Sequence, residues 1–266
     1  MMRDRFNRRI NYLRISVTDR CNLRCTYCMP ADGVEWKPHT DILTFEEIAN
    51  VTREAVQLGV NKVRLTGGEP LTRRGVVHLV SMLAAIPGIT DLAMTTNGIL
   101  LAHYAADLRN AGLHRLNISL DSLDPKRFAD ITRGGNVADA IKGIEAARAA
   151  GFTTLKLNCV IDTTCDEPDA RAVAAFANQH GLGVRFIRRM ETAHGRFWGV
   201  IGGDGGHCDR CNRLRLSSVG NVYPCLFNDV SFSVREWGAR QALLAAVAAK
   251  PRSGQQSHNQ FFQIGG

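Results

Sequence analysis

The sequence is poor in aromatic residues and lacks long apolar segments. Only 7% of its 266 residues are Phe, Trp or Tyr, and these are not interleaved with the basic residues as a stacking platform for nucleic-acid bases requires. The formal net charge of +8 therefore predicts an anionic partner other than nucleic acid. No apolar run is long enough to span a bilayer and no signal-peptide core is present, so we expect a cytoplasmic protein without membrane contact.

The cysteines do not form the pattern of a disulfide framework. Six of the eight fall into two tight groups of three in a long chain, which is more typical of metal ligands in a reducing compartment. Three thiolates can hold three corners of a [4Fe–4S] cube and leave one iron open for chemistry. The candidate ligands are Cys21, Cys25 and Cys28 in the first group and Cys208, Cys211 and Cys225 in the second.

Zinc is the alternative for both groups, because zinc also binds closely spaced cysteines. The first group would need a fourth ligand, and the nearest histidine after it is His39. The second could be completed by His207 or Cys165 as a zinc knuckle, and ligand count alone leaves this open. Cys159 lies on an apolar strand face and is interpreted as a small core residue.

Short alternating segments and helical segments follow one another along the first two-thirds of the chain. This order is typical of an α/β protein with a parallel sheet and right-handed crossovers. The helix that begins at residue 45 has a capping box of Thr44 and Glu47 and ends at Gly59. Strands are predicted at 12–17, 62–66, 91–95, 115–120, 154–161 and 184–187, and helices at 45–58, 76–86, 102–111, 138–150 and 169–180.

The strands alternate between apolar and polar residues, whereas a parallel sheet covered on both faces is apolar almost throughout. The pattern places Arg14, Arg64, Lys156 and Ser119 on a common polar face. A curled sheet with helices outside and a polar lumen explains this face. About six units are too few for a closed barrel, so we predict a partial, open parallel β/α barrel with its site at the carboxyl ends of the strands. A doubly wound open sheet is the alternative.

A loop with two glycines, Gly67 and Gly68, follows the second predicted strand and leads to Glu69. The glycines let the backbone approach a ligand closely, and Glu69 can accept a hydrogen bond from an ammonium group. Together with the first cysteine group, in the loop after the preceding strand, this loop resembles the radical S-adenosylmethionine (SAM) superfamily. There the open iron is chelated by the amino and carboxylate groups of SAM.

A closer resemblance extends through nearly the whole chain. The motifs at 16–30, 64–70, 95–98, 117–121, 156–158, 208–216 and 265–266 resemble the GTP 3′,8-cyclase family, lyases that catalyse the first step of molybdenum cofactor biosynthesis. The resemblance implies SAM, GTP, an electron donor and two [4Fe–4S] clusters held by the two cysteine groups. It also implies SAM contacts by Tyr27, Gly68, Glu69, Ser119 and Met190, and GTP contacts by Arg14, Arg64, Thr95, Lys156, Arg213 and Arg215.

The implied reaction is radical. Reductive cleavage of SAM gives a 5′-deoxyadenosyl radical that takes hydrogen from C3′ of the ribose, and the carbon radical then attacks C8 of guanine. The product is 3′,8-cyclo-7,8-dihydro-GTP, and the protein contributes positioning and the exclusion of water and oxygen. Basic side chains gathered in a cavity agree with a triphosphate, which Arg binds in a bidentate manner.

The chain departs from this family in one segment. Between Met190 and Cys208 it has several dozen fewer residues, and Arg188 and Arg189 replace an acidic and an aromatic residue. We expect a radical SAM domain at 1–190, an auxiliary-cluster region at 191–250 and a flexible tail at 251–266, with a homodimer as a candidate assembly. The alternative functions are a radical SAM enzyme acting on another substrate such as a peptide, and a non-catalytic iron–sulfur or zinc protein.

Overall fold

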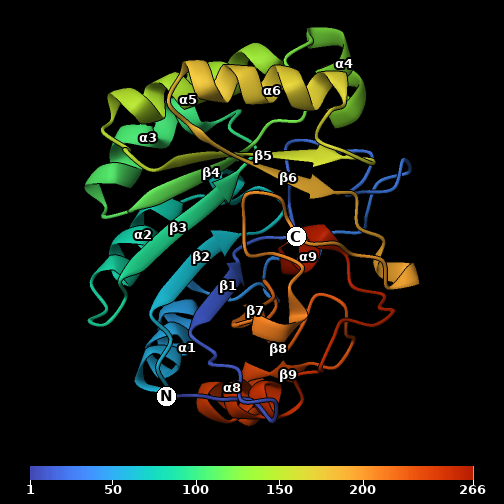
Figure 1. Ribbon diagram of the computed structural model, residues 1–266. Helices are drawn as coiled ribbons and strands as arrows, with labels where there is room; N and C mark the ends of the chain where they lie inside the picture. The colour runs from blue at the N-terminus through green and yellow to red at the C-terminus, as the bar shows by residue number, and fades with distance from the viewer. Residues whose placement is uncertain (266) are drawn as a thin grey trace.

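The computed structural model describes residues 1–265 and contains one mixed sheet with helices along one face (Figure 1). The strand order is β6-β5-β4-β3-β2-β1-β7-β8-β9. The strands are β1 (Tyr12–Ser16), β2 (Lys62–Thr66), β3 (Asp91–Thr96), β4 (Arg115–Ser119), β5 (Leu155–Ile161), β6 (Gly183–Arg188), β7 (Arg213–Leu216), β8 (Asn221–Tyr223) and β9 (Phe232–Ser233). The α-helices are α1 (Phe45–Gln57), α2 (Val76–Ala84), α3 (Leu101–Asn110), α4 (Pro125–Thr132), α5 (Val137–Ala149), α6 (Pro168–Gln179), α7 (Val234–Trp237), α8 (Ala239–Ala248) and α9 (Phe261–Ile264).

Strands β1 to β6 are all parallel, and each is joined to the next by a segment that contains at least one helix. The sheet curls but does not close, since β6 and β9 are its two edges (Figure 1). The predicted partial barrel of about six units is therefore confirmed, and every predicted strand and helix boundary lies within two residues of the observed one.

The extension of the sheet beyond β1 was not predicted from the sequence. Strand β7 pairs with β1 in parallel, with Arg14 opposite Arg215, and β8 and β9 continue antiparallel. Helix α4 was also missed. Strand β7 has only four residues and pairs with a strand about 200 positions earlier. No local sequence pattern therefore predicts its pairing partner. Within the described residues, the C-terminal region thus shares the sheet of the barrel.

The predicted alternation is present in the structure. Along β5, Leu155, Leu157, Cys159 and Ile161 are buried in the core, while the residues between them are half-buried and face the concave side. Burial of Cys159 agrees with its interpretation as a core residue. The apolar face packs against α1, α2, α3, α5 and α6, so the polar face is left to line the lumen.

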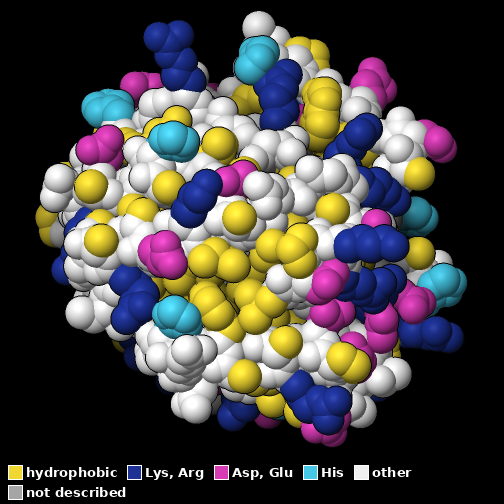
Figure 2. Space-filling view, turned by 90° about the horizontal axis from the view of Figure 1, so that it is seen from above, with side chains coloured by type: hydrophobic (Ala, Val, Ile, Leu, Met, Phe, Trp, Pro, Cys, Tyr) yellow, Lys and Arg dark blue, Asp and Glu magenta, His cyan; other side chains and the backbone are white. Residues whose placement is uncertain are grey.

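Charge on the outer surface is mixed in sign. Figure 2 shows basic, acidic and histidine side chains interspersed around a group of apolar ones on the face seen from above in Figure 1. None of the helices in residues 1–265 is long and apolar enough to cross a membrane.

The capping box at the start of α1 forms as predicted. The Thr44 hydroxyl accepts from the backbone N–H of Glu47 at 3.2 Å, and the Glu47 carboxylate accepts from the N–H of Thr44 at 2.7 Å. We expect Thr44→Ala to lower the free energy of unfolding by about 1 kcal/mol, because an N–H at the helix start loses its acceptor. Urea unfolding of the apoprotein measures this, with Thr40→Ala in the exposed turn nearby as control. Equal stabilities of the two variants would contradict the prediction.

Candidate active site

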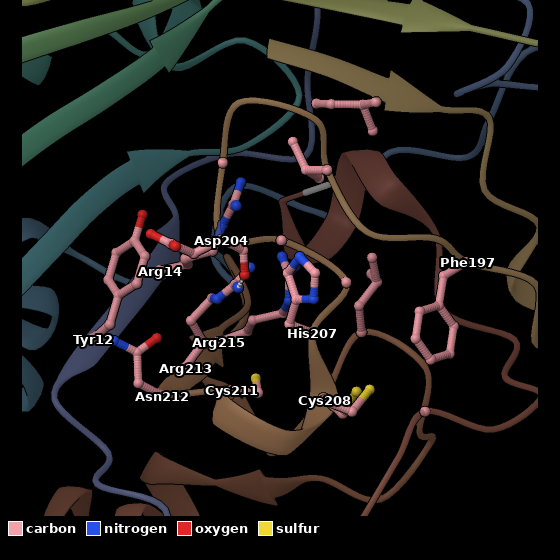
Figure 3. Close-up of a pocket in the computed structure, with 18 of the residues that line it drawn as sticks. Tyr12, Arg14, Phe197, Asp204, His207, Cys208, Cys211, Asn212, Arg213 and Arg215 are labelled. Carbon is pink, nitrogen blue, oxygen red and sulfur yellow. Dashed lines mark hydrogen bonds between the residues drawn. The ribbon is translucent and has the colours of Figure 1, made fainter. Parts of the chain in front are cut away.

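Two adjoining cavities lie in the lumen, one of about 420 Å³ and one of about 190 Å³. The smaller lies at the carboxyl ends of the parallel strands, whereas the larger extends to their amino ends, where Tyr12, Lys62 and Arg115 line it. The smaller is lined by the first cysteine group and the larger by the second (Figure 3). Four residues line both cavities: Thr95, Asn158, Ile187 and Met190. The structure thus brings the two cysteine groups, which are 180 positions apart in the sequence, to neighbouring spaces.

The first cysteine loop leaves the carboxyl end of β1 and is braced by the loop after β2. The N–H of Gly68 donates to the carbonyl of Thr18 at 2.8 Å, and the N–H of Glu69 donates to that of Arg20 at 2.8 Å. A Cβ on Gly68 would overlap the Arg20 carbonyl and would lie 2.8 Å from the carbonyl oxygen of Asp19. Gly68 is therefore required for the approach of the two loops to each other.

The cysteines of this loop suit an iron–sulfur cluster. Burial raises the pKa of Cys21 to about 11 and the pKa values of Cys25 and Cys28 to about 12. Buried thiolates therefore need a cation, which iron supplies. The Cys21 sulfur accepts from the N–H of Leu23 at 3.4 Å and from the Asn97 amide at 3.9 Å. Such donors to cysteine sulfur are one of the means by which proteins tune clusters.

The other residues predicted to contact SAM line the smaller cavity: Tyr27, Gly68, Glu69, Ser119 and Met190. The Tyr27 hydroxyl donates to Asp121 at 2.7 Å. Glu69 accepts from the Thr96 hydroxyl at 2.7 Å and from the backbone N–H groups of Leu71 and Asn97. Burial raises the pKa of Glu69 to about 7 despite these donors.

The larger cavity is strongly basic. Sheet register places Arg215, Arg14 and Arg64 side by side on β7, β1 and β2. Burial, followed by the charges of neighbouring arginines, lowers the pKa of Arg14 well below its usual value. Burial and Arg213 lower the pKa of Arg215 to about 10. Removal from water and mutual repulsion thus both disfavour these charges unless an anion is bound.

Several polar atoms of this cavity are buried without a hydrogen-bond partner among residues 1–265, namely Nε of Arg64, Nε of Arg185 and Oδ1 of Asn158. Arg64 also donates from Nη1 to the Thr95 hydroxyl at 3.3 Å. With its amide oxygen turned toward the guanidinium groups, Asn117 accepts from Arg64 at 3.2 Å and from Arg185 at 3.1 Å. The cavity therefore presents donors that a bound molecule with several acceptors can use.

Of the residues predicted to bind GTP, five line the larger cavity: Arg14, Arg64, Thr95, Arg213 and Arg215. The sixth, Lys156, does not line it. Burial lowers the pKa of Lys156, and the charges of Arg185 and other cations lower it further. This cavity is also lined by three basic residues that were not predicted: Lys62, Arg115 and Arg185. Alternation along β2, β4 and β6 could have found them, since each shares the polar face of its strand.

The second cysteine group lies at the wall of the larger cavity, beside Arg213 and Arg215 (Figure 3). The Cys225 sulfur accepts from the N–H of Phe227 at 3.4 Å. Burial raises the pKa of Cys211, but the charges of Lys250 and Arg213 outweigh burial, so the pKa lies below its usual value. Three cysteine thiols at this wall are a donor set that fits a metal cluster.

The candidate fourth zinc ligands lie in different places. His39 pairs with Arg20 at 3.0 Å on the surface, whereas His207 lines the larger cavity next to Cys208. Cys165 packs at the edge of the main core. Among residues 1–265, no three His, Cys, Asp or Glu side chains are placed to hold a single metal ion.

The end of the described chain lies inside the lumen. Phe262 and Ile264 of α9 are buried, and the Arg215 guanidinium donates to the carbonyls of Ile264 and Gly265. Gly265 lies so close to Thr66 that a Cβ would overlap the threonine hydroxyl. Gly265 therefore lies in the lumen, between Arg215 and Thr66; Gly266 lies outside the described residues.

The segment between Met190 and Cys208, which we expect to be short relative to the family, lines the larger cavity, for example through Phe197 and Trp198. Just before it, Arg188 and Arg189 line the smaller cavity, and Arg189 pairs with Asp162 at 2.8 Å. Ile201 forms an antiparallel bridge with Phe186 of β6. The segment therefore runs from the edge strand β6 across the open side of the barrel toward β7.

Comparison with known proteins decides the family. The model of the radical SAM superfamily matches residues 15–174. A GTP 3′,8-cyclase of Moorella thermoacetica is 42% identical, over 94% of this chain and 92% of that protein. One of Pelotomaculum thermopropionicum is 40% identical over the full length of both. The chain belongs to the GTP 3′,8-cyclase family of radical SAM enzymes. Membership of the superfamily implies SAM and a [4Fe–4S] cluster as cofactors.

Solved structures agree with the fold. Streptococcus suis SuiB, in a crystal structure with S-adenosylmethionine, superposes with a TM-score of 0.63 at 16% identity, over 91% of this chain and 64% of SuiB. Methylornithine synthase (PylB) gives a TM-score of 0.56 at 17% identity, over 68% of this chain and 54% of that one. At these identities the likeness concerns the fold alone.

The contact of Gly68 with the cysteine loop can be tested by substitution. We expect Gly68→Ala to displace residues 19–20, to destabilise the apoprotein by about 1–3 kcal/mol, and to lower the iron bound at the first cysteine group. Unfolding curves and iron analysis after anaerobic reconstitution measure both effects. Gly183→Ala is the matched control, because its Cβ would meet only the flexible Lys156 side chain, at 3.2 Å. Wild-type iron content in Gly68→Ala would contradict this role.

Proposed function

We propose that this chain converts GTP to 3′,8-cyclo-7,8-dihydro-GTP, with SAM in the smaller cavity and GTP in the larger one. The observation that carries this proposal is the arrangement of two adjoining cavities, each with its own cysteine triad, the larger of which is lined by the row of Arg215, Arg14 and Arg64 on neighbouring strands. The reaction requires the reacting atoms of SAM and GTP to meet, and two cavities that adjoin each other allow this at their junction.

The smaller cavity would hold the first cluster through Cys21, Cys25 and Cys28. When bound, a cluster with an open iron supplies the electron that cleaves SAM. The chain's own contribution is to hold SAM in one orientation. Tyr27 and Ser119 present polar atoms, and the backbone at Gly68 lies against the cysteine loop. An external electron donor is part of this proposal.

The larger cavity would hold GTP between the arginines and a second [4Fe–4S] cluster at Cys208, Cys211 and Cys225. Arginine binds phosphate in a bidentate manner and stays charged where lysine loses its proton. The unpartnered Nε atoms of Arg64 and Arg185 point to acceptors on a ligand. A triphosphate offsets the repulsion within this row, which a neutral substrate would leave in place.

The junction of the two cavities would set the reaction geometry. Thr95 and Asn158 provide polar atoms there, and Ile187 and Met190 provide apolar surface. Apolar walls limit water near the reacting ribose, and the polar atoms can fix its hydroxyl groups. Positioning of this kind is the main way in which a protein assists chemistry carried out by a cofactor.

The reaction is tested with the reconstituted protein. Anaerobic loading is expected to give about eight irons per chain, two cubes of four. Reduced protein with SAM and GTP is expected to yield 5′-deoxyadenosine and the cyclised nucleotide, detected by mass spectrometry. Formation of 5′-deoxyadenosine without loss of GTP would refute the substrate, and zinc in place of iron would refute both clusters.

Loss of a single lumen arginine should weaken GTP binding. A charge-assisted hydrogen bond contributes about 1.5–3 kcal/mol, so Arg64→Gln is expected to raise the dissociation constant for GTP roughly 10- to 150-fold. Equilibrium binding to the reconstituted protein measures this. Arg74→Gln, at an exposed position after β2, is the matched control. Unchanged affinity in Arg64→Gln would exclude Arg64 from the nucleotide site.

A further inference from the structure

Lys250 is the largest of the fully buried side chains among the described residues, with 2% of its surface exposed. It follows the end of α8 and lines the larger cavity. Its ammonium group donates to the carbonyl oxygen of Arg213 at 2.7 Å and to that of Pro224 at 2.6 Å. The first carbonyl lies two residues after Cys211 and the second lies directly before Cys225. Lys250 therefore links the chain segment next to Cys211 to the segment next to Cys225.

The charge of Lys250 is not balanced by a carboxylate. Within residues 1–265 it forms no ion pair, and its charged neighbours in the cavity include Arg213 and Arg215. Burial of an ammonium group among cations is strongly unfavourable, and two neutral carbonyls offset only part of this cost. The site is therefore complete only when an anion lies close to the ammonium group.

The second cysteine triad is the anion that best fits this position. An iron–sulfur cube held by three thiolates carries a net negative charge, since the thiolates outweigh the charge of the core. The two hydrogen bonds of Lys250 end on backbone carbonyls beside Cys211 and Cys225. A nucleotide phosphate is the competing anion, but it would not explain why Lys250 donates hydrogen bonds to the backbone beside both Cys211 and Cys225.

We propose that Lys250 is a positioning residue and counter-charge for the second cluster, which it holds in place and makes easier to reduce. This inference rests on the proposed second cluster. Lys250 donates hydrogen bonds to the backbone around the ligands, as residues around metal ligands commonly do. Its positive charge stabilises the reduced, more negative form of the cluster and so raises the reduction potential.

The test uses full-length protein with Cys21, Cys25 and Cys28 replaced by Ala, so that only the second triad can load. In this background, Lys250→Met removes charge and donors, Lys250→Gln keeps donors without charge, and Lys250→Arg keeps both. Lys142→Met, at an exposed position on α5, is the control. Iron content, the rate of iron loss to a ferrous chelator and the midpoint potential are measured anaerobically, and unfolding of the apoproteins reports on stability.

We expect Lys250→Met to lose iron about tenfold faster, within the range known for residues around metal ligands, and to have a more negative potential. Lys250→Gln should retain iron better than Lys250→Met but share its lower potential, and Lys250→Arg should restore both. If Lys250→Met does not fold, Lys250→Gln and Lys250→Arg decide the question through the potential alone.

The contrary outcomes are distinct. A potential and an iron-loss rate equal to those of Lys142→Met would overturn the role, as would lower stability of the apoprotein with an unchanged potential. Weaker GTP binding in otherwise wild-type protein, with an unchanged cluster, would overturn it and assign Lys250 to the nucleotide. If the triple-alanine background binds no iron, the second cluster itself fails, and this result is separate from any effect of Lys250.

Discussion

The concentration of positive charge inside the barrel is the constraint on which the rest of this structure depends. Arg14, Arg64 and Arg215 are neighbours because their strands are paired in register, and their Cα atoms cannot separate without breaking the sheet. Burial and mutual repulsion both disfavour their charged forms. The lumen is therefore a preformed site for an anion. The unfavourable free energy of burying the arginines there must be offset by favourable packing elsewhere in the fold.

Strand β1 connects this charge with the metal chemistry. The carboxyl end of β1 leads into the first cysteine loop, and its middle residue is Arg14. One edge of β1 pairs with β2 and the other pairs with β7, which begins two residues after Cys211. The pairing of β1 with β7 thus sets the distance between the two cysteine groups through backbone hydrogen bonds. A rigid element of this kind holds reacting groups more precisely than a loop.

The sequence was sufficient for the features that depend on local periodicity. The six parallel strands, their polar face and the α1 cap all follow from patterns within about fifteen residues. Strand β7 was missed because its signal is four residues long and its partner is far away in the chain. Gly68 permits the close approach that its lack of a side chain predicts, and the structure adds a partner that the sequence does not indicate, the Arg20 carbonyl. Lys250 gives no sequence signal, since burial of a lysine after a helix is a property of tertiary packing.

The connection between β6 and the second cysteine group affects the shape of the larger cavity more than the position of the cysteines. The alignment with the Pelotomaculum protein extends over 325 positions, well beyond the 266 residues of this chain, so that relative carries residues that this chain lacks. If the connection set the place of Cys208 and Cys211, its length would be critical. Their place is set instead by β7, held against β1, and by Arg8, whose guanidinium donates to the Cys208 carbonyl. The connection itself contributes the bridge from Ile201 to β6 and the Asp204 carbonyl that accepts from Arg213. A change in its length therefore alters how the larger cavity is covered, while the two cysteine groups keep their relation through the sheet.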